Sequence, residues 1–142
     1  MSSNNNRVNR YKAHQNLVKE TKFALQRKYT GKIRTFDRHV GKFLPLVFIK
    51  KVLSRQESIS NWSKYIVAIN KKGMADVYGY ISLHNILIHL EFEMKTGKAV
   101  QTKEQKDWQK HIESMGGFYC LVRDADKAIE ELENYLRTRK LI

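Results

Sequence analysis

Two short runs rich in apolar and aromatic residues, joined by a polar segment, constrain the fold of this chain more than any other feature. The first run is ADVYGYI at residues 75–81, the second is ILIHLEFEM at residues 86–94, and SLHN separates them. Runs of this length and composition on either side of a short polar connection are typical of antiparallel strands. The sequence therefore predicts a β-hairpin, against which the rest of the chain must pack.

The second of these strands ends in alternating charges. Glu91, Glu93 and Lys95 are spaced two residues apart, so in an extended chain all three project from one face. Phe92 and Met94 then face the opposite side. A charged face at the end of an apolar strand indicates either a salt-bridged edge or an active site. Glu91 is open to three interpretations: a support for Glu93, a partner for a lysine, or a direct metal ligand.

Asp76 begins the first strand of the hairpin, three residues after Gly73. If the two strands pair antiparallel, their outer ends meet, and Asp76 lies beside Glu93 and Lys95. Two carboxylates supply the oxygen ligands that Mg²⁺ and Mn²⁺ prefer, and an adjacent ammonium can orient water or neutralise a phosphorane-like transition state. This combination favours phosphodiester hydrolysis. The ordinary alternative for Asp76 is capping of a turn, and that for Glu93 with Lys95 is a cross-strand ion pair.

The remaining segments predict a compact α/β domain with a mixed sheet flanked by helices. The expected elements are a helix over 11–29, one or two strands within 32–49, a short helix or basic loop over 50–63, a strand at 65–70, a helix over 103–115 capped by Thr102, a strand at 118–123 and a helix over 125–137. Residues 1–10 are expected to form a disordered leader, and residues 11–142 a single domain.

Positive charge is concentrated in the first half of the chain. Residues 1–64 carry 15 basic and three acidic side chains, a net charge of +12, whereas the remainder carries 12 basic and 11 acidic, a net charge of +1. Such an asymmetry favours an anionic partner, although a solvated basic face is the ordinary alternative. Nucleic acid fits better than a membrane surface, because the basic region has no strongly amphipathic helix with bulky apolar anchors.

The expected compartment is the cytoplasm. No run approaches the roughly 18–20 apolar residues that a membrane span requires, and the opening MSSNNNRVNR has no secretory-signal pattern. The lone Cys120 has no partner for an internal disulfide and is expected to be a small core residue.

Several of these features, taken in order, resemble one nuclease superfamily. Gly-x-x-Asp at residues 73–76, an apolar strand ending in Glu93-x-Lys95, the later Gln105 and the Gly-Gly-aromatic run at 116–118 are similar to PD-(D/E)xK nucleases. Within that superfamily, the stretch over about residues 70–123 looks like the small stand-alone type of the virus-type replication–repair nuclease family (VRR-NUC). Ala75 stands where the superfamily motif has proline, a position without a ligand role. Residues 46–64 match nothing in the family pattern.

The resemblance implies a restriction-endonuclease-like core and a Mg²⁺- or Mn²⁺-dependent DNA endonuclease. It implies that Asp76, Glu93 and the backbone carbonyl of Met94 bind the metal and that Lys95 is the catalytic lysine. Gln105 would lie at the rim of the site, and Glu20 would be an additional, helix-borne acid contacting metal or water. It further implies branched or Holliday-junction DNA as substrate, and a bacterium or a phage-infected host cell as the source of the cytoplasm. Because symmetric cutting of a junction needs two sites, it also implies a homodimer.

Other residues complete the hypothesis. The candidates for phosphate contacts flank the expected site and are Arg34, Arg38, Lys42 and Lys98. The five histidines, at positions 14, 39, 84, 89 and 111, have no metal-binding spacing and are interpreted as structural or phosphate-facing, whereas Trp62 and Trp108 are interpreted as packing residues. The rival hypothesis is a catalytically idle nucleic-acid-binding module, and an RNase is a weaker third one.

Overall fold

The fold is taken from a computed structural model, which describes residues 2–38, 41–43, 46–56, 58, 60, 67–69 and 72–142, with the backbone alone at 2–5, 41–43, 46–49 and 67–69. The chain divides into two compact units. The first is formed by Met1–Arg38 together with Gly73–Ile142, and the second by His39–Lys72. The second unit is thus inserted between the two segments of the first, which we call the main unit, and the single domain expected over 11–142 stays a prediction.

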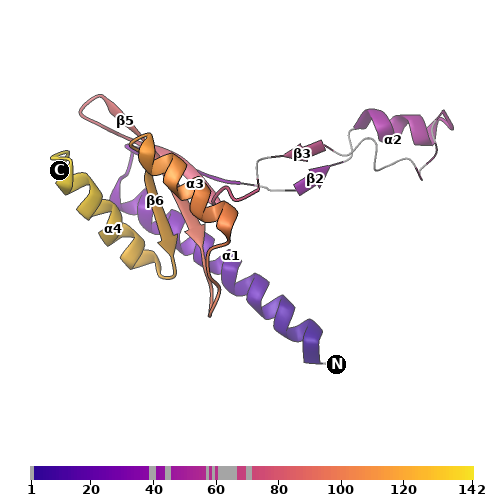
Figure 1. The fold of residues 1–142 in the computed structure, drawn as a ribbon, viewed down its shortest axis with the longest axis horizontal. Helices are drawn as coiled ribbons and strands as arrows, with labels where there is room; N and C mark the ends of the chain where they lie inside the picture. The colour runs from indigo at the N-terminus through magenta and orange to yellow at the C-terminus, as the bar shows by residue number, and fades with distance from the viewer. Residues whose placement is uncertain are drawn as a thin grey trace. The chain divides into compact units, whose positions relative to one another are not determined.

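The main unit is built on a four-stranded mixed sheet (Figure 1). Its strands, in spatial order, are β1 (Ile33–Asp37), β4 (Val77–Leu83), β5 (Ile86–Met94) and β6 (Phe118–Val122). The first three pair antiparallel, and β6 joins β5 in parallel. A parallel pair requires a crossover connection, which helix α3 (Lys103–Ser114) supplies. The α/β class and the hairpin of β4 with β5 are thus confirmed.

Helices α1 (Ser2–Lys28) and α4 (Ala125–Thr138) pack on one face of this sheet, and α3 packs on the other. Successive side chains of β6 point alternately to the two faces of the sheet, so they join the cores on opposite sides of it. Cys120 and its alternate neighbours join the larger core with Leu25 of α1 and Leu132 of α4, whereas Tyr119 packs with Ile112 of α3. Cys120 is a buried core residue, as predicted.

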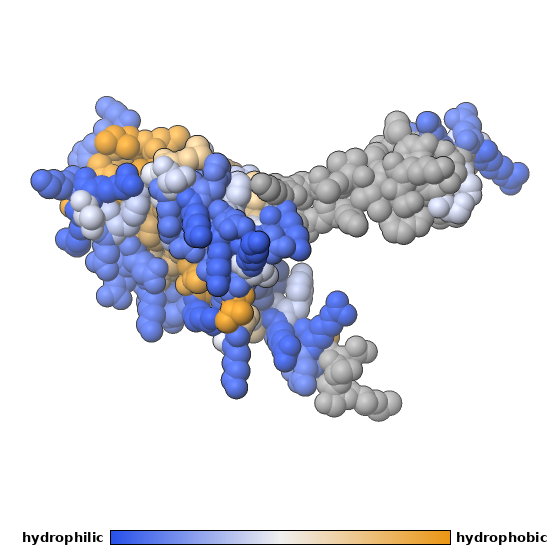
Figure 2. Space-filling view, in the orientation of Figure 1, coloured by the Kyte–Doolittle hydropathy of each residue, from blue (hydrophilic) through white to orange (hydrophobic). Residues whose placement is uncertain are grey.

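The N-terminal helix is longer than predicted. It begins at Ser2 rather than at residue 11, so residues 2–10 of the expected disordered leader are helical, and Figure 1 shows this end extending beyond the sheet. None of the helices in the described part of the chain is long and apolar enough to cross a membrane. On the face seen in Figure 2, hydrophilic side chains cover much of the main unit, and a hydrophobic area lies near the turn between β4 and β5.

The inserted unit contains a two-stranded antiparallel sheet and one helix in its described part. The strands are β2 (Gly41–Phe43) and β3 (Val67–Ile69), and the helix is α2 (Leu46–Leu53). Within the main unit, the segments that precede and follow the insertion are joined, because the backbone N–H of Arg38 donates a hydrogen bond to the carbonyl oxygen of Asp76 at 2.7 Å.

Gly73 is required where the chain re-enters the main unit. Its φ of +95° lies in a region that side chains rarely adopt, and a Cβ atom built there would come within 2.5 Å of the backbone oxygen of Glu104 on α3. The glycine therefore allows the turn before Asp76 to lie directly against α3.

We expect Leu132→Ala to destabilise the main unit by about 2–5 kcal/mol, because removing a fully buried leucine leaves a cavity. Leu87→Ala is the matched control, since this leucine is 66% exposed. Urea unfolding followed by circular dichroism measures both. Equal losses in the two variants would contradict the assigned core.

Candidate active site

The outer ends of β4 and β5 meet as predicted. Val77 lies opposite Phe92 in the ladder, and the backbone N–H of Met94 donates a hydrogen bond to Oδ2 of Asp76 at 2.8 Å. Asp76 is thus fixed against the end of the strand that carries Glu93 and Lys95. The convergence inferred from the hairpin is present.

Glu93, Lys95 and Gln105 form a connected, largely buried group. Lys95 Nζ lies 2.9 Å from Oε1 of Glu93, with the two side chains 10% and 3% exposed. The same ammonium donates to Oε1 of Gln105 at 2.8 Å, and the Gln105 amide nitrogen donates to Oε1 of Glu93. Each of the three side chains thus contacts the other two.

Gln105 is held in place by the start of α3. Thr102 is the N-cap of this helix, and its hydroxyl accepts a hydrogen bond from the backbone N–H of Gln105. In return, Oε1 of Gln105 accepts from the backbone N–H of Thr102 at 2.9 Å. This capping box orients the amide toward Glu93 and Lys95. It gives the polar residue predicted at the rim of the site a structural reason to be there.

Glu93 is the most perturbed acid of the site. Burial, and then the negative charge of Asp76, raise its pKa to about 7, against the opposing influence of Lys95 and His14. Its Oε2 atom is buried and has no hydrogen-bond partner among the described residues. A buried carboxylate oxygen without a partner is costly, and a bound cation would remove that cost.

His14 is a residue of this site that the sequence analysis did not assign to it. Its Nε2 lies 3.3 Å from Oδ2 of Asp76, which brings α1 to the end of the sheet. A signal was present in the sequence, because His14 lies one helical step before Leu17 and Val18, both of which are buried. The apolar stripe of the helix therefore continues into the site.

Glu91 is neither a ligand candidate nor a surface acid. It is fully buried and bound by Arg38 in a two-point ion pair, at 2.6 and 2.9 Å, and by His89 at 2.8 Å. Burial opposes ionisation of Glu91, but the hydrogen bonds and charges of His89 and Arg38 outweigh it and hold the pKa of this carboxyl below its usual value. The Arg38 side chain is only 6% exposed. This position argues against the phosphate contact predicted for Arg38. It favours a supporting role, in which Arg38 holds Glu91 in place.

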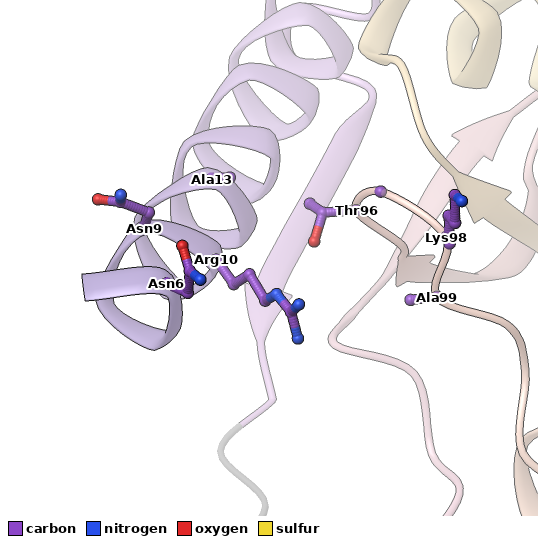
Figure 3. Close-up of a pocket in the computed structure, with 8 residues that line it drawn as sticks. Asn6, Asn9, Arg10, Ala13, Thr96, Lys98 and Ala99 are labelled. Atoms are coloured by element: carbon purple, nitrogen blue, oxygen red, sulfur yellow. The ribbon is translucent and has the colours of Figure 1, made fainter. Parts of the chain in front are cut away.

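Two adjoining cavities lie between α1 and the loop that follows β5. The first, of about 460 Å³, is lined by residues that include Glu20 and Lys95. The second, of about 750 Å³, is lined by residues that include Arg10 and Lys98. Both share Ala13, Thr96 and Gly97, so we describe them together as the α1 groove. In Figure 3, Arg10 extends from the helix toward the loop that carries Thr96 and Ala99.

The other predicted residues divide by position. Lys98 and Glu20 line the α1 groove, whereas the exposed Arg34 lies on β1. Trp108 packs against the smaller core, as predicted. The side chain of Lys42, and all of His39 and Trp62, lie outside the described residues. The metal roles expected for Glu20 and for the Met94 carbonyl stay predictions.

The acids of the site fit a small divalent cation with few protein ligands. Among the residues that the structure describes, no three His, Cys, Asp or Glu side chains are arranged to hold a metal ion. The candidate oxygen donors are Asp76 and Glu93, the latter with its unpartnered Oε2. Mg²⁺ is commonly bound through one or two carboxylates, with water and substrate phosphate in the other positions.

Comparisons with known proteins found no match to this chain among family models, curated proteins or solved structures.

We expect Arg38→Ala to cost about 3–5 kcal/mol of stability, because it leaves the buried Glu91 carboxylate without its main partner. Replacing both residues, Arg38→Met with Glu91→Leu, should recover most of the loss. A double-mutant cycle by urea unfolding measures the coupling. In the wild type, the ionised Glu91 carboxylate adds to the free energy of unfolding at a pH above its unfolded pKa of 4.5. This stabilisation is lost as the pH falls through the lower pKa of the folded state. Additive losses in the cycle would show that the pair is not coupled.

Proposed function

We propose that this protein is a Mg²⁺- or Mn²⁺-dependent DNA endonuclease that hydrolyses phosphodiester bonds, with Asp76, Glu93, Lys95 and Gln105 as its active site. The observation that carries the proposal is the convergence of two acids, one lysine and one glutamine, with a buried Glu93 oxygen that lacks a partner. If Glu93 and Lys95 formed only a structural ion pair, they would not need Asp76 nearby, because its negative charge raises the pKa of Glu93.

A divalent cation bound by Asp76 and Glu93 would stabilise the charge that develops on the phosphate and lower the pKa of water. The protein's own residues then have separate tasks. Glu93 must be ionised to act as a ligand, and the neighbouring ammonium of Lys95 favours that form. The N–H of Met94 holds Oδ2 of Asp76, whereas no hydrogen bond to Oδ1 comes from the described residues.

Lys95 has the position expected of a residue that handles the attacking water or the phosphate. Its ammonium is tied to Glu93 and Gln105, which leaves one of its three protons for a further acceptor. In hydrolysis the water oxygen bonds to phosphorus and one ester P–O bond breaks, while the proton lost by water and the proton gained by the leaving oxygen exchange with solvent. Lys95 would orient the water and offset the negative charge of the transition state.

The α1 groove is the surface best placed to hold the DNA backbone beside these residues. Lys95 lines it, Arg10 and Lys98 add positive charge, and Arg123 borders it at the end of β6. Contacts of this kind position a duplex without reading its sequence. Branched or junction DNA as the substrate, and a homodimer to cut it symmetrically, belong to the same proposal through the resemblance described above.

A catalytically idle nucleic-acid-binding module is the second candidate. The net charge of +12 over residues 1–64 favours it as much as a nuclease. The buried, unpartnered oxygen of Glu93 argues against it, because a module that only binds has no use for that cost.

We expect Asp76→Ala and Lys95→Ala each to lower cleavage of labelled linear, flap and four-way DNA by at least about 100-fold in Mg²⁺ or Mn²⁺, because each removes a group from the transition state. Binding of the same DNAs, measured without metal, should change little by comparison. Lys110→Ala, an exposed lysine of α3, is the matched control for the loss of one positive charge. Normal cutting by both site variants would place the active site elsewhere, and binding by the wild type without any cleavage would favour the idle module.

We expect Mn²⁺ to raise the melting temperature of the wild type and to raise it more at pH 8 than at pH 6. Below its pKa of about 7 Glu93 is mostly protonated, so a metal ion must displace a proton to bind. At a metal concentration 100 times the dissociation constant, the stabilisation is about 2.7 kcal/mol. Thermal unfolding of the wild type and of the isosteric Glu93→Gln variant measures it. An equal shift in both proteins would contradict the proposed metal site.

A further inference from the structure

We propose that the face of β1 and β4 that carries Phe36, Tyr78 and Tyr80 is a stacking platform for unpaired nucleobases next to the candidate active site. The proposal deepens the proposed function, on which it rests, because it names a feature of the substrate: a single-stranded segment beside the bond to be cut. The stacking platform is defined by these three aromatic residues.

The three rings form one cluster on neighbouring strands. Phe36 pairs with Tyr78 in the ladder of β1 with β4, and their ring centroids are 5.4 Å apart. Tyr80 lies two residues further along β4, with its ring 6.3 Å from that of Phe36. Side chains two residues apart on a strand share a face, so all three rings project to the same side of the sheet.

This cluster lies open to solvent, although it is apolar and aromatic. Phe36 is 43% exposed and Tyr80 is 40% exposed, whereas the other face of the same strands is buried, with Ile33, Val77 and Ile81 in the larger core. Exposed aromatic rings on a sheet surface bind unpaired bases by stacking in several nucleic-acid-binding folds, and such stacking tolerates any sequence because every base has a π-face.

The charges around the platform favour a polyanion over another apolar surface. Arg34 is exposed on the same face of β1, and the guanidinium of Arg38 lies over the ring of Tyr78 at 4.5 Å from its centroid. On β1, β4 and β5, all of whose residues the structure describes, the acids of this face are Glu91 and Glu93, and both are buried. Asp37 alternates to the other side of β1 and pairs with Lys22. A phosphate backbone that follows the rings thus meets the exposed Arg34, and on these three strands it meets no exposed acid of this face.

A continuous row of contacts joins the platform to the candidate active site. Arg38 packs on Tyr78 and binds Glu91, which is the neighbour of Glu93 on the same face of β5. A strand whose bases stack on the rings would therefore continue toward the carboxylates. A fully paired duplex has no free base faces to offer, so the platform would favour DNA with a flap, a tail or an opened branch.

Binding to two DNA probes tests the platform. We would compare a duplex that carries a tail of about ten unpaired thymidines with the fully paired duplex, by fluorescence anisotropy in EDTA, so that the result does not depend on cleavage. The wild type should prefer the tailed probe. Phe36→Ala and Tyr80→Ala should each weaken binding of the tailed probe by about five-fold or more, and the ratio of affinities between the two probes should fall. Phe36→Tyr and Tyr80→Phe, which keep the rings, should retain the preference.

Leu87→Ala is the matched control, since it removes an exposed apolar side chain from the same face of β5 without removing a ring. It should leave the affinity ratio at the wild-type value. No tail preference in the wild type, or an equal loss for both probes in the alanine variants, would overturn the platform. A change from dimer to monomer in those variants, by analytical ultracentrifugation, with the tail preference retained, would show that the rings cover a second copy of the chain instead.

A measurement on the wild type avoids any loss of folding in the variants. Photocrosslinking with 5-iodouracil in the tail, followed by mass spectrometry, should attach the tail to Phe36, Tyr78 or Tyr80, and attachment only elsewhere would overturn the proposal. The two proposals fail separately. Ring-dependent tail binding without any cleavage in Mn²⁺ would leave the platform standing and refute the nuclease, whereas cleavage without tail preference would do the reverse.

Discussion

The antiparallel register of β4 on β5 is the constraint on which the rest of the site depends. With Val77 opposite Phe92, the buried apolar residues of both strands face α1 and α4, and the acids face the opposite side. A slip of one residue would turn every side chain to the other face. The same register brings the carboxylate of Asp76 to the backbone N–H of Met94. A single pairing therefore fixes both the core and the position of the acids.

The two buried glutamates of β5 show how neighbouring positions can have opposite electrostatics. Glu91 is held ionised by a guanidinium and an imidazole, so its charge is satisfied within the protein. Glu93, two residues further on, shares one oxygen with Lys95 and Gln105 and leaves the other without a partner. Burial raises the pKa of both carboxyls. At Glu91 the hydrogen bonds and charges of His89 and Arg38 outweigh burial and lower the pKa, whereas at Glu93 burial and the charge of Asp76 outweigh Lys95 and His14 and raise it. The first arrangement is stable as it stands, and the second remains incomplete without a ligand.

The sequence predicts the parts of the site that are close together in a strand or at the start of a helix. Asp76, Glu93 and Lys95 follow from the hairpin, and Gln105 follows from the capped helix that comes next. Contacts between segments that are distant in the sequence leave no pattern in it from which they could be predicted. Arg38 is 53 residues from Glu91, and its pairing depends on β1 being the neighbour of β4, which periodicity does not reveal. The inserted unit could not be predicted either. Its boundaries follow from contacts between residues, and no change in the composition of the sequence marks them.

The hydrogen bond that joins the ends of β1 and β4 has a consequence for how this chain can vary. Because the N–H of Arg38 bonds to the carbonyl of Asp76, β1 and β4 complete their ladder at the point where His39–Lys72 leaves and returns. The entropy of closing such a loop grows only slowly with its length. Insertions, deletions or wholesale replacement between these two positions would therefore leave the sheet and its carboxylates in register. Evolution could alter this segment freely while the chemistry beside it stays the same.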